Sequence, residues 1–172
     1  IQNIFFFIYK EAKDIMTHRS NICALDGTIN LQEALDRVLV EPYSRFPVYL
    51  DDIDNIIGIL HIKEIMAFSR KDSYLSWQIK DIDGLFSKVE FIPETRKISD
   101  LFQKMQAKKA HLVIVVDEYG QTSGLVALED ILEEIVGNIF DEHDKERRLI
   151  ETQPGGSFIM YGMASFDDVA DA

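Results

Sequence analysis

Two acidic residues occupy matching places in the sequence, and each stands where an apolar strand is expected to pass directly into a helix. Asp130 follows Gly124 in GLVALEDILEEIVG, and Glu64 follows Gly58 in GILHIKEIM. Glycine lets another group approach the backbone closely, and the first turn of a helix has N–H groups without a partner inside the helix. A carboxylate at that place can accept two hydrogen bonds from the adjacent hydroxyls of a ribose. The pattern predicts a junction that binds a ligand without reacting with it.

A phosphorylated ligand needs a cation as well, because a carboxylate repels phosphate. Arg45, in the stretch YSRFP, is the candidate, since a guanidinium group matches two phosphate oxygens at once. Both residues also have plainer interpretations that stay open at this point. Asp130 can simply complement the dipole of its helix, and Arg45 can be a solvated charge on a strand.

The two junctions belong to an internal repeat, which is the main organising feature of the chain. Residues 44–66 align with residues 110–132 without a gap, and residues 31–39 align with residues 98–106 after a shift of one position. Each unit reads as a short strand, an amphipathic helix, a strand, a turn, a strand and a helix. The aligned pairs include Phe46 with Leu112, Gly58 with Gly124, Arg45 with His111, and Glu64 with Asp130.

The helices of the two units show one apolar face each, and Gly137 is expected to end the last helix. One such unit of about 55 residues buries too little surface to be stable alone, so the two units are expected to share a core. The prediction is an α/β (α+β) fold with two β-α-β-β-α units packed as a pseudo-two-fold pair, linkers at both ends, and two related clefts. The apolar positions of the first and last helices are Leu31, Ala34, Leu35, Val38, Leu39, Leu128, Ile131, Leu132, Ile135 and Val136.

Composition narrows the function classes. The 172 residues are 47% apolar and 28% charged, with a net charge of −12, which is typical of a globular protein and gives no basic face for nucleic acid. No nucleophile motif, phosphate loop or pair of metal ligands is present, so we expect no enzyme and no protein-held metal. The single cysteine, Cys23, excludes a disulfide within the chain.

Four stretches taken together resemble one family: AKDIMTHR, YSRFPVY, IDNIIGILHIKEI and HLVIVVDEYGQTSGLVALEDILEEIVGNIFDEHD. They are similar to the tandem CBS-domain pair of the CorC/CorB (hemolysin-related, CNNM-like) magnesium and cobalt transport family, from Lys13 to Asp144. The resemblance implies five segments. These are a linker helix from an upstream region at 1–13, a first CBS domain at 14–70, a connector at 71–82, a second CBS domain at 83–140, and at 141–172 a linker with the start of a transporter-associated domain, its first strand in GSFIMYGMAS.

The resemblance also implies a ligand: an adenine nucleotide (AMP, ADP or ATP), with or without Mg²⁺. Its ribose would lie on the acid of the second unit, and its phosphates would lie near the YSRFP strand of the first. This family usually has Thr where the chain has Ala127, a loss worth about 0.5–1.5 kcal/mol of hydrogen bonding. The cleft at Glu64, with His61 beside it, is expected to stay empty. The residues carried over are Tyr43, Ser44, Arg45, Pro47, Ala127 and Asp130, with Ile15, Met16, Thr17 and Ile22 on the side of the base.

From this resemblance we expect a regulatory module that controls an adjoining membrane transport domain from the cytoplasmic side of the membrane. Helices at 62–69 and 128–139 are expected to form a homodimer, since a two-fold interface is self-complementary. A different class of function stays open: a structural dimerisation and docking module whose nucleotide site is lost. Ala127 and Glu64 are the residues that favour this alternative.

Overall fold

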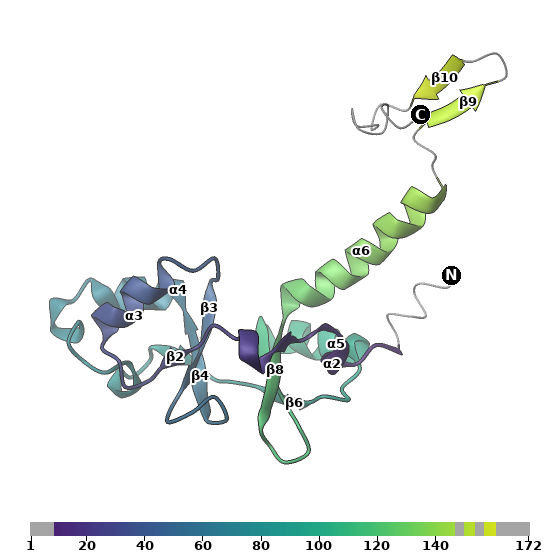
Figure 1. Ribbon diagram of the computed structural model, residues 1–172. Coiled ribbons are helices and arrows are strands. Elements are labelled where there is room, and N and C mark those ends of the chain that lie inside the picture. The colour runs from purple at the N-terminus through teal and green to yellow at the C-terminus, as the bar shows by residue number, and fades with distance from the viewer. Residues whose placement is uncertain (1–8, 147–149, 154–156, 161–172) are drawn as a thin grey trace.

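The computed structural model describes residues 9–146, 150–153 and 157–160. Two units, each a small sheet with helices against it, lie side by side, and a long last helix extends away from them (Figure 1). The helices are α2 (Ala12–Ile15), α3 (Leu31–Val38), α4 (Ile62–Ser69), α5 (Ile98–Lys108) and α6 (Leu128–Glu146), with 3₁₀ turns η1 (Arg19–Asn21), η2 (Asp72–Tyr74) and η3 (Ile79–Asp81). The strands are β1 (Thr17–His18), β2 (Leu25–Asp26), β3 (Arg45–Tyr49), β4 (Ile56–His61), β5 (Phe86–Ser87), β6 (Phe91–Pro93), β7 (Leu112–Val116), β8 (Thr122–Ala127), β9 (Ile150–Gln153) and β10 (Ser157–Met160).

The two four-stranded sheets have the same order, which confirms the expected mixed α/β fold with repeated units. One sheet runs β2-β3-β4-β5 and the other runs β6-β7-β8-β1. In each sheet a parallel strand lies on one side of an antiparallel hairpin, and a short antiparallel strand lies on the other. That last strand comes from the other half of the chain in both cases. The units therefore exchange their edge strands, a feature that the sequence pattern did not predict.

The ungapped alignment of the two hairpins is wrong by one position in the first strand. β3 begins at Arg45 and β7 at Leu112, whereas β4 begins at Ile56 and β8 at Thr122, so the second hairpin turn is one residue shorter. Burial agrees, since β3 and β7 share one pattern along their lengths. The carbonyl groups of Ser44 and His111 accept equivalent hydrogen bonds, each from the first residue of the following helix. His111 therefore stands where Ser44 does, and Leu112 stands where Arg45 does.

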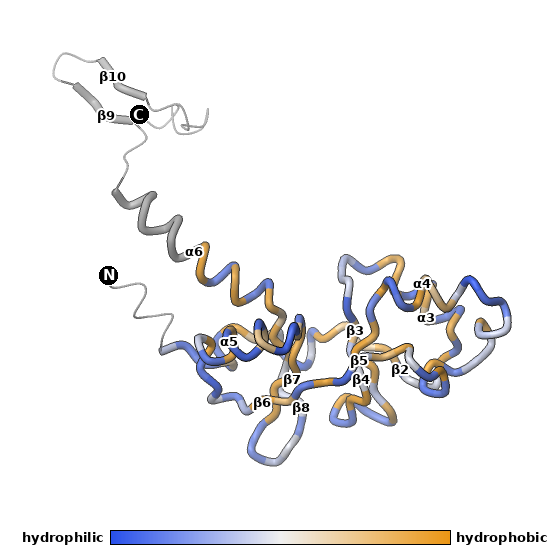
Figure 2. Tube along the Cα trace, turned by 180° about the vertical axis from the view of Figure 1, so that it is seen from behind, coloured by the Kyte–Doolittle hydropathy of each residue, from blue (hydrophilic) through white to orange (hydrophobic). Residues whose placement is uncertain are grey.

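The core divides into a cluster within each unit and a third cluster between the sheets. β7 shows why both layers form: Val113 and Val115 pack into the cluster of the second unit, and Ile114 packs into the cluster between the sheets. All three are buried, as the continuous apolar run LVIVV predicts. Figure 2 shows the same distribution, with hydrophobic residues along the strands and hydrophilic residues in the turns. The cluster between the sheets contains Ile56, Ile59 and Ile114.

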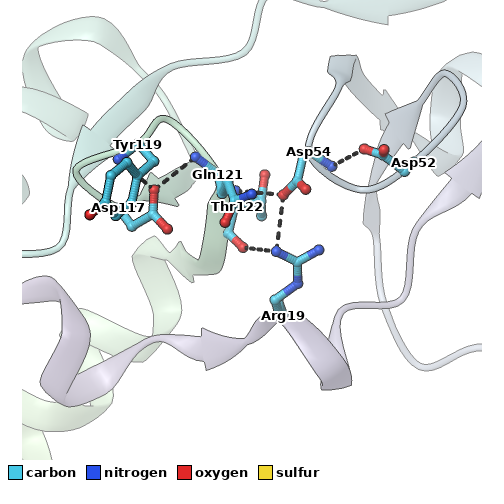
Figure 3. A network of polar contacts seen from close by, with 7 residues as sticks. All are labelled: Arg19, Asp52, Asp54, Asp117, Tyr119, Gln121 and Thr122. Carbon is cyan, nitrogen blue, oxygen red and sulfur yellow. Dashed lines mark hydrogen bonds and ion pairs between the residues drawn. The ribbon is translucent and has the colours of Figure 1, made fainter.

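A polar network also joins the two units (Figure 3). One carboxylate oxygen of Asp54, in the turn of the first hairpin, accepts a hydrogen bond from the Thr122 N–H at 2.9 Å and one from Arg19 at 3.0 Å. The same guanidinium nitrogen of Arg19 donates to the Thr122 carbonyl at 3.1 Å. Within the turns, Asp52 and Asp117 accept backbone N–H groups through their own carboxylates. The turn of the first unit is thereby fixed against β8 of the second.

Several expectations at the chain ends need correction. α6 does not end at Gly137 but continues to Glu146, because glycine weakens a helix without forcing its end. Most of the expected linker helix at 1–13 lies outside the described residues; Lys10 and Glu11 are not helical, and Glu11 forms a bridge with Lys97. In the C-terminal segment, β10 lies within GSFIMYGMAS, and β9 precedes it where a linker was expected. No helix among the described residues combines the length and apolarity that a membrane span requires.

Candidate functional site

A cavity of about 320 Å³ lies where the two units meet, at the start of β3 and at the junction of β8 with α6. Its volume is within the range of about 300–1,000 Å³ that is typical of small-molecule sites. The first unit contributes the segment around η1 and the residues that lead into β3, and the second contributes the ends of two strands and the first turn of α6. The lining consists of Thr17, Asn21, Ile22, Cys23, Pro42, Tyr43, Ser44, Arg45, Pro47, His111, Leu112, Leu125, Ala127, Glu129 and Asp130.

The structure brings together all but two of the residues that the sequence assigned to this site. Tyr43 is 52% exposed and Ser44 is also exposed, whereas Arg45 is half-buried and Pro47 is buried. Ile15 and Met16 do not line the cavity, because their side chains pack against the core of the second unit. The residues that do line it are Thr17, Ile22, Tyr43, Ser44, Arg45, Pro47, Ala127 and Asp130.

Gly124 has a different role from the one that the sequence suggested. A Cβ atom at this position would lie 2.4 Å from the Thr17 carbonyl oxygen and 2.8 Å from the Met16 sulfur. The group that approaches the glycine is therefore the exchanged strand β1, which pairs with β8 through Thr17 and His18. The absence of a side chain at Gly124 lets β1 reach the place where Thr17 lines the cavity.

The Asp130 carboxylate has a structural partner as well as access to the cavity. Its Oδ2 accepts a hydrogen bond from the Ala127 N–H at 2.9 Å. Burial raises the pKa of the carboxyl group, the hydrogen bond from Ala127 opposes this, and the charges of Glu129 and Glu133 add to the rise. The capping interaction holds the carboxylate at the cavity wall and leaves it able to accept further hydrogen bonds, since a carboxylate has about four acceptor positions.

Sequence reasoning missed part of the lining. Pro42 and Leu125 adjoin stretches that were chosen, and Glu129 lies beside Asp130, so adjacency alone could have suggested them. Asn21 and Cys23 flank Ile22, which the sequence did assign, so adjacency could have suggested them too, although nothing in the sequence marked the exchanged strand that precedes them. Burial raises the pKa of the Cys23 thiol, with a smaller contribution from Glu41. The residues not predicted are Asn21, Cys23, Pro42, His111, Leu112, Leu125 and Glu129.

A second and larger cavity, of about 580 Å³, lies at the junction of β4 with α4. It shares Arg45, His111 and Leu112 with the first, so the two cavities are neighbours. At this junction the Nδ1 atom of His61 accepts the Lys63 N–H at 2.9 Å, and Glu64 is exposed. Burial lowers the pKa of His61, with help from Arg45 and Lys63.

In the part of the chain that the structure describes, no group of three or more His, Cys, Asp or Glu side chains is arranged to hold a metal ion. The lining of the first cavity also contains a cation, Arg45. The arrangement offers one guanidinium, two carboxylates and an exposed tyrosine around a partly apolar space. Such a set can bind a ligand with hydroxyl groups at one end and negative charge at the other.

Comparison with known proteins agrees with this architecture. A family model described as "CBS domain" matches residues 12–71 and 79–137. The magnesium and cobalt efflux protein CorC of Pasteurella multocida is 41% identical over 134 residues, which are 78% of this chain and 43% of that protein. CorC of Salmonella typhimurium is 35% identical over 164 residues, 95% of this chain and 55% of that protein. The chain thus spans about half the length of these relatives.

Solved structures of CBS domains superpose on the two units. The CBS domain of a bacterial CNNM/CorC family Mg²⁺ transporter in complex with ATP has a TM-score of 0.73 and 31% identity, over 79% of this chain and 94% of that one. A CBS-domain pair with bound AMP from Klebsiella pneumoniae has a TM-score of 0.65 and 31% identity, over 74% of this chain and 98% of that one. Both halves of the repeat lie within the matched family residues. The chain therefore belongs to the CBS domain family, as a tandem pair similar to those of CorC proteins and hemolysin C homologues.

Proposed function

We propose that this CBS pair is a regulatory module that binds an adenine nucleotide in the cavity at Asp130 and controls an adjoining membrane transport domain. The observation that carries the proposal is the placement of Asp130 and Arg45 on the wall of one cavity between the units. The carboxylate accepts the two ribose hydroxyls, the guanidinium binds the phosphate group, and Tyr43 with Ile22 covers the base. The similar structures with ATP and AMP support an adenine nucleotide as the ligand.

Regulation requires that the ligand bind one arrangement of the units better than another. The cavity suits this task, because its two ends belong to different units and the ligand would join them. The similarity to CorC proteins supports a transport domain as the controlled part. We place the module at the cytoplasmic face of the membrane, where adenine nucleotides are abundant, and Mg²⁺ would enter with the phosphates.

The proposed homodimer uses apolar side chains that the pair leaves exposed on α4 and α6. Met66 is 50% exposed on α4, and Leu132 and Val136 are 41% and 45% exposed on α6. The sequence assigned the last two to the apolar face of their helix, yet only Ile131 of that face is fully buried. A two-fold contact between copies would cover these side chains.

Calorimetric titration of the purified chain with AMP, ADP and ATP, with and without Mg²⁺, tests the nucleotide site. Asp130→Asn is the sharpest variant, because its side-chain oxygen can still accept the Ala127 N–H while the second carboxylate oxygen is lost. We expect it to lower affinity about tenfold or more, and Asp130→Ala at least as much. Glu133→Gln, on the next turn of α6, is the matched control and should bind as the unaltered chain does.

Binding of a 2′-deoxynucleotide tests whether Asp130 contacts the ribose directly. In the unaltered chain, loss of the 2′-hydroxyl should weaken binding, and in Asp130→Asn the same loss should cost much less, because the two groups interact directly. Equal losses in both proteins would contradict the contact between the ribose and Asp130.

The second candidate function is a structural dimerisation and docking module with no nucleotide site. Ala127 favours it, because this residue brings no hydroxyl to the cavity and Asp130 already serves as the cap of α6. Absence of heat with all three nucleotides at millimolar concentration, together with a dimer in sedimentation analysis, would support this alternative and contradict the first.

A further inference from the structure

The larger cavity, at the junction of β4 with α4, differs from the nucleotide cavity in charge. Four Lys or Arg side chains, two histidines and two acidic side chains line it, although the chain as a whole has 30 Asp or Glu and 18 Lys or Arg residues. Lys108 pairs with Glu90 at 2.8 Å, which neutralises one of the acids. The nucleotide cavity has the opposite balance, with Arg45 as its only Lys or Arg beside two carboxylates. The basic side chains of the larger cavity are Arg45, Lys88, Lys108 and Lys109.

The equivalence between residues of the two units explains why this cavity is more basic. Because the second hairpin turn is one residue shorter, Lys109 and Ala110 stand where the first unit has Pro42 and Tyr43. Lysine and alanine thus replace the proline and the tyrosine that line the nucleotide cavity. No Phe, Tyr or Trp is in the lining of this cavity, whose rings are the imidazoles of His61 and His111, and Glu64 at its helix start is exposed. Its lining is suited to an anion and not to a nucleoside.

Lys109 occupies a backbone position that normally favours glycine. It follows α5 with φ 53° and ψ 32°, in the left-handed region, where a side chain costs about 1 kcal/mol or more. Neither Lys109 nor Lys88 takes part in an ion pair among the residues that the structure describes. A lysine that lines a cavity and has no charged partner among the described residues has its ammonium group available for a ligand.

We propose that this cavity is a phosphate subsite, which binds the phosphate groups of an oligophosphate anion through Lys88, Lys109 and Arg45. Each ammonium or guanidinium group donates charge-assisted hydrogen bonds to phosphate oxygens. Arg45 also lines the nucleotide cavity, so the anion is either a free oligophosphate or the phosphate tail of a nucleotide held at Asp130. Only the second source rests on the proposed function.

Inorganic tripolyphosphate in magnesium-free buffer is the direct probe, measured by calorimetry at several salt concentrations. Lys109→Gly removes the charge and relieves the backbone strain, so this variant should fold at least as well as the unaltered chain. We expect Lys109→Gly and Lys88→Gln each to weaken tripolyphosphate binding about tenfold. Lys80→Gln, an exposed lysine in the connector that lines neither cavity, should change nothing. Absent binding, or binding that both cavity variants leave unchanged, would overturn the proposal.

Titration with nucleotides then identifies the source of the phosphate groups. If Lys109→Gly weakens the binding of ATP about tenfold and leaves the binding of AMP unchanged, the subsite binds the phosphate tail of a nucleotide. If it weakens tripolyphosphate and leaves ATP unchanged, the subsite takes a free anion. ATP binding that depends on Asp130 but on neither lysine, with no binding of tripolyphosphate, would overturn the subsite and leave the proposed function intact.

Discussion

The two strand-to-helix junctions share a backbone but satisfy the first turn of their helices in different ways. At the start of α6 the Asp130 carboxylate reaches back to the N–H of Ala127, the residue before the helix, and the Ala127 side chain has no group that could cap. At the start of α4 the His61 side chain caps the Lys63 N–H, and the acid Glu64 stays at the surface. Each acid lines a different cavity, Asp130 the smaller one and Glu64 the larger one. A repeated fold can therefore carry two different chemistries.

The largest effect on stability is expected at the two glycines against which the exchanged strands lie, Gly124 and Gly58. In Gly124→Ala the new methyl group would meet backbone, the Thr17 carbonyl oxygen at 2.4 Å, so β1 must move. In Gly58→Ala the nearest atom is Phe86 Cβ at 2.7 Å, in the other exchanged strand. We expect a loss of about 2–4 kcal/mol in the free energy of unfolding for Gly124→Ala and somewhat less for Gly58→Ala.

Denaturation in urea, with the slope compared among the variants, measures these losses. Gly124→Ala should also weaken nucleotide binding, since Thr17 lines the cavity, whereas Gly58→Ala should not. Unchanged stability of Gly124→Ala would mean that β1 does not lie against β8.

The two exchanged strands, β1 and β5, are also the part of the fold that the sequence could not predict. Apolar periodicity and the repeat predicted the two units, the buried strand β7, and a cavity between Arg45 and Asp130. Periodicity describes neighbours within a unit, so it could not reveal that Thr17 and Phe86 join the sheet of the opposite unit. Ile15 and Met16 were assigned to the side of the base from the family resemblance; the structure packs both against the core of the second unit, and neither lines the cavity.

The shorter second turn explains why residues of the first strand were paired wrongly between the units. An ungapped alignment cannot place a one-residue deletion, and a shift of one position moves each side chain to the other face of the strand. Arg45 was therefore matched with His111, when Leu112 is its structural equivalent. The basic lining of the larger cavity was missed as well, because Lys88 and Lys109 come from separate segments that no single motif contains.

The next effect concerns His61 and depends on pH. A protonated Nδ1 cannot accept the Lys63 N–H, and burial lowers the pKa of the ring below its ordinary value of about 6.5. Because the pKa of His61 is lower in the folded state than in the unfolded state, neutral His61 stabilises the fold fully above about pH 6.5. This stabilisation is lost as the pH falls through the folded-state pKa. His61→Ala should lower the free energy of unfolding by about 1 kcal/mol at pH 7.5.

His61→Asn separates the cap from the titration. Asparagine caps a helix well and does not titrate, so this variant should keep the stability of the unaltered chain at pH 7.5 and show a weaker dependence between pH 7 and 5. Thermal unfolding followed by circular dichroism across that range is sufficient. If both proteins had the same pH profile, the Nδ1 cap would not be the titrating element.

A smaller gain is expected when the second junction receives a capping side chain. Ala127→Thr places a hydroxyl that can accept an N–H from the first turn of α6, while Asp130 still accepts the N–H of residue 127, which completes a reciprocal capping box. We expect about 0.5–1 kcal/mol of added stability. Because Ala127 lines the cavity at Asp130, the proposed nucleotide affinity should rise as well, which calorimetry can measure. Added stability with no gain in affinity would mean that the hydroxyl does not face the ligand.

The smallest effect concerns the lengths of the two helices. α4 ends at Ser69, whereas α6 runs past Gly137 to Glu146, although the glycine lowers the helix propensity at that point. Among the described residues, and apart from the backbone of its own helix, no heavy atom lies within 4 Å of a Cβ built on Gly137, and the φ angle of residue 137 is not positive. Gly137→Ala should therefore raise the stability of α6 by about 0.5–1 kcal/mol and increase the helical signal in circular dichroism. A loss of stability would show that residue 137 adopts a left-handed conformation in solution and that α6 ends there, as α4 ends at the equivalent place.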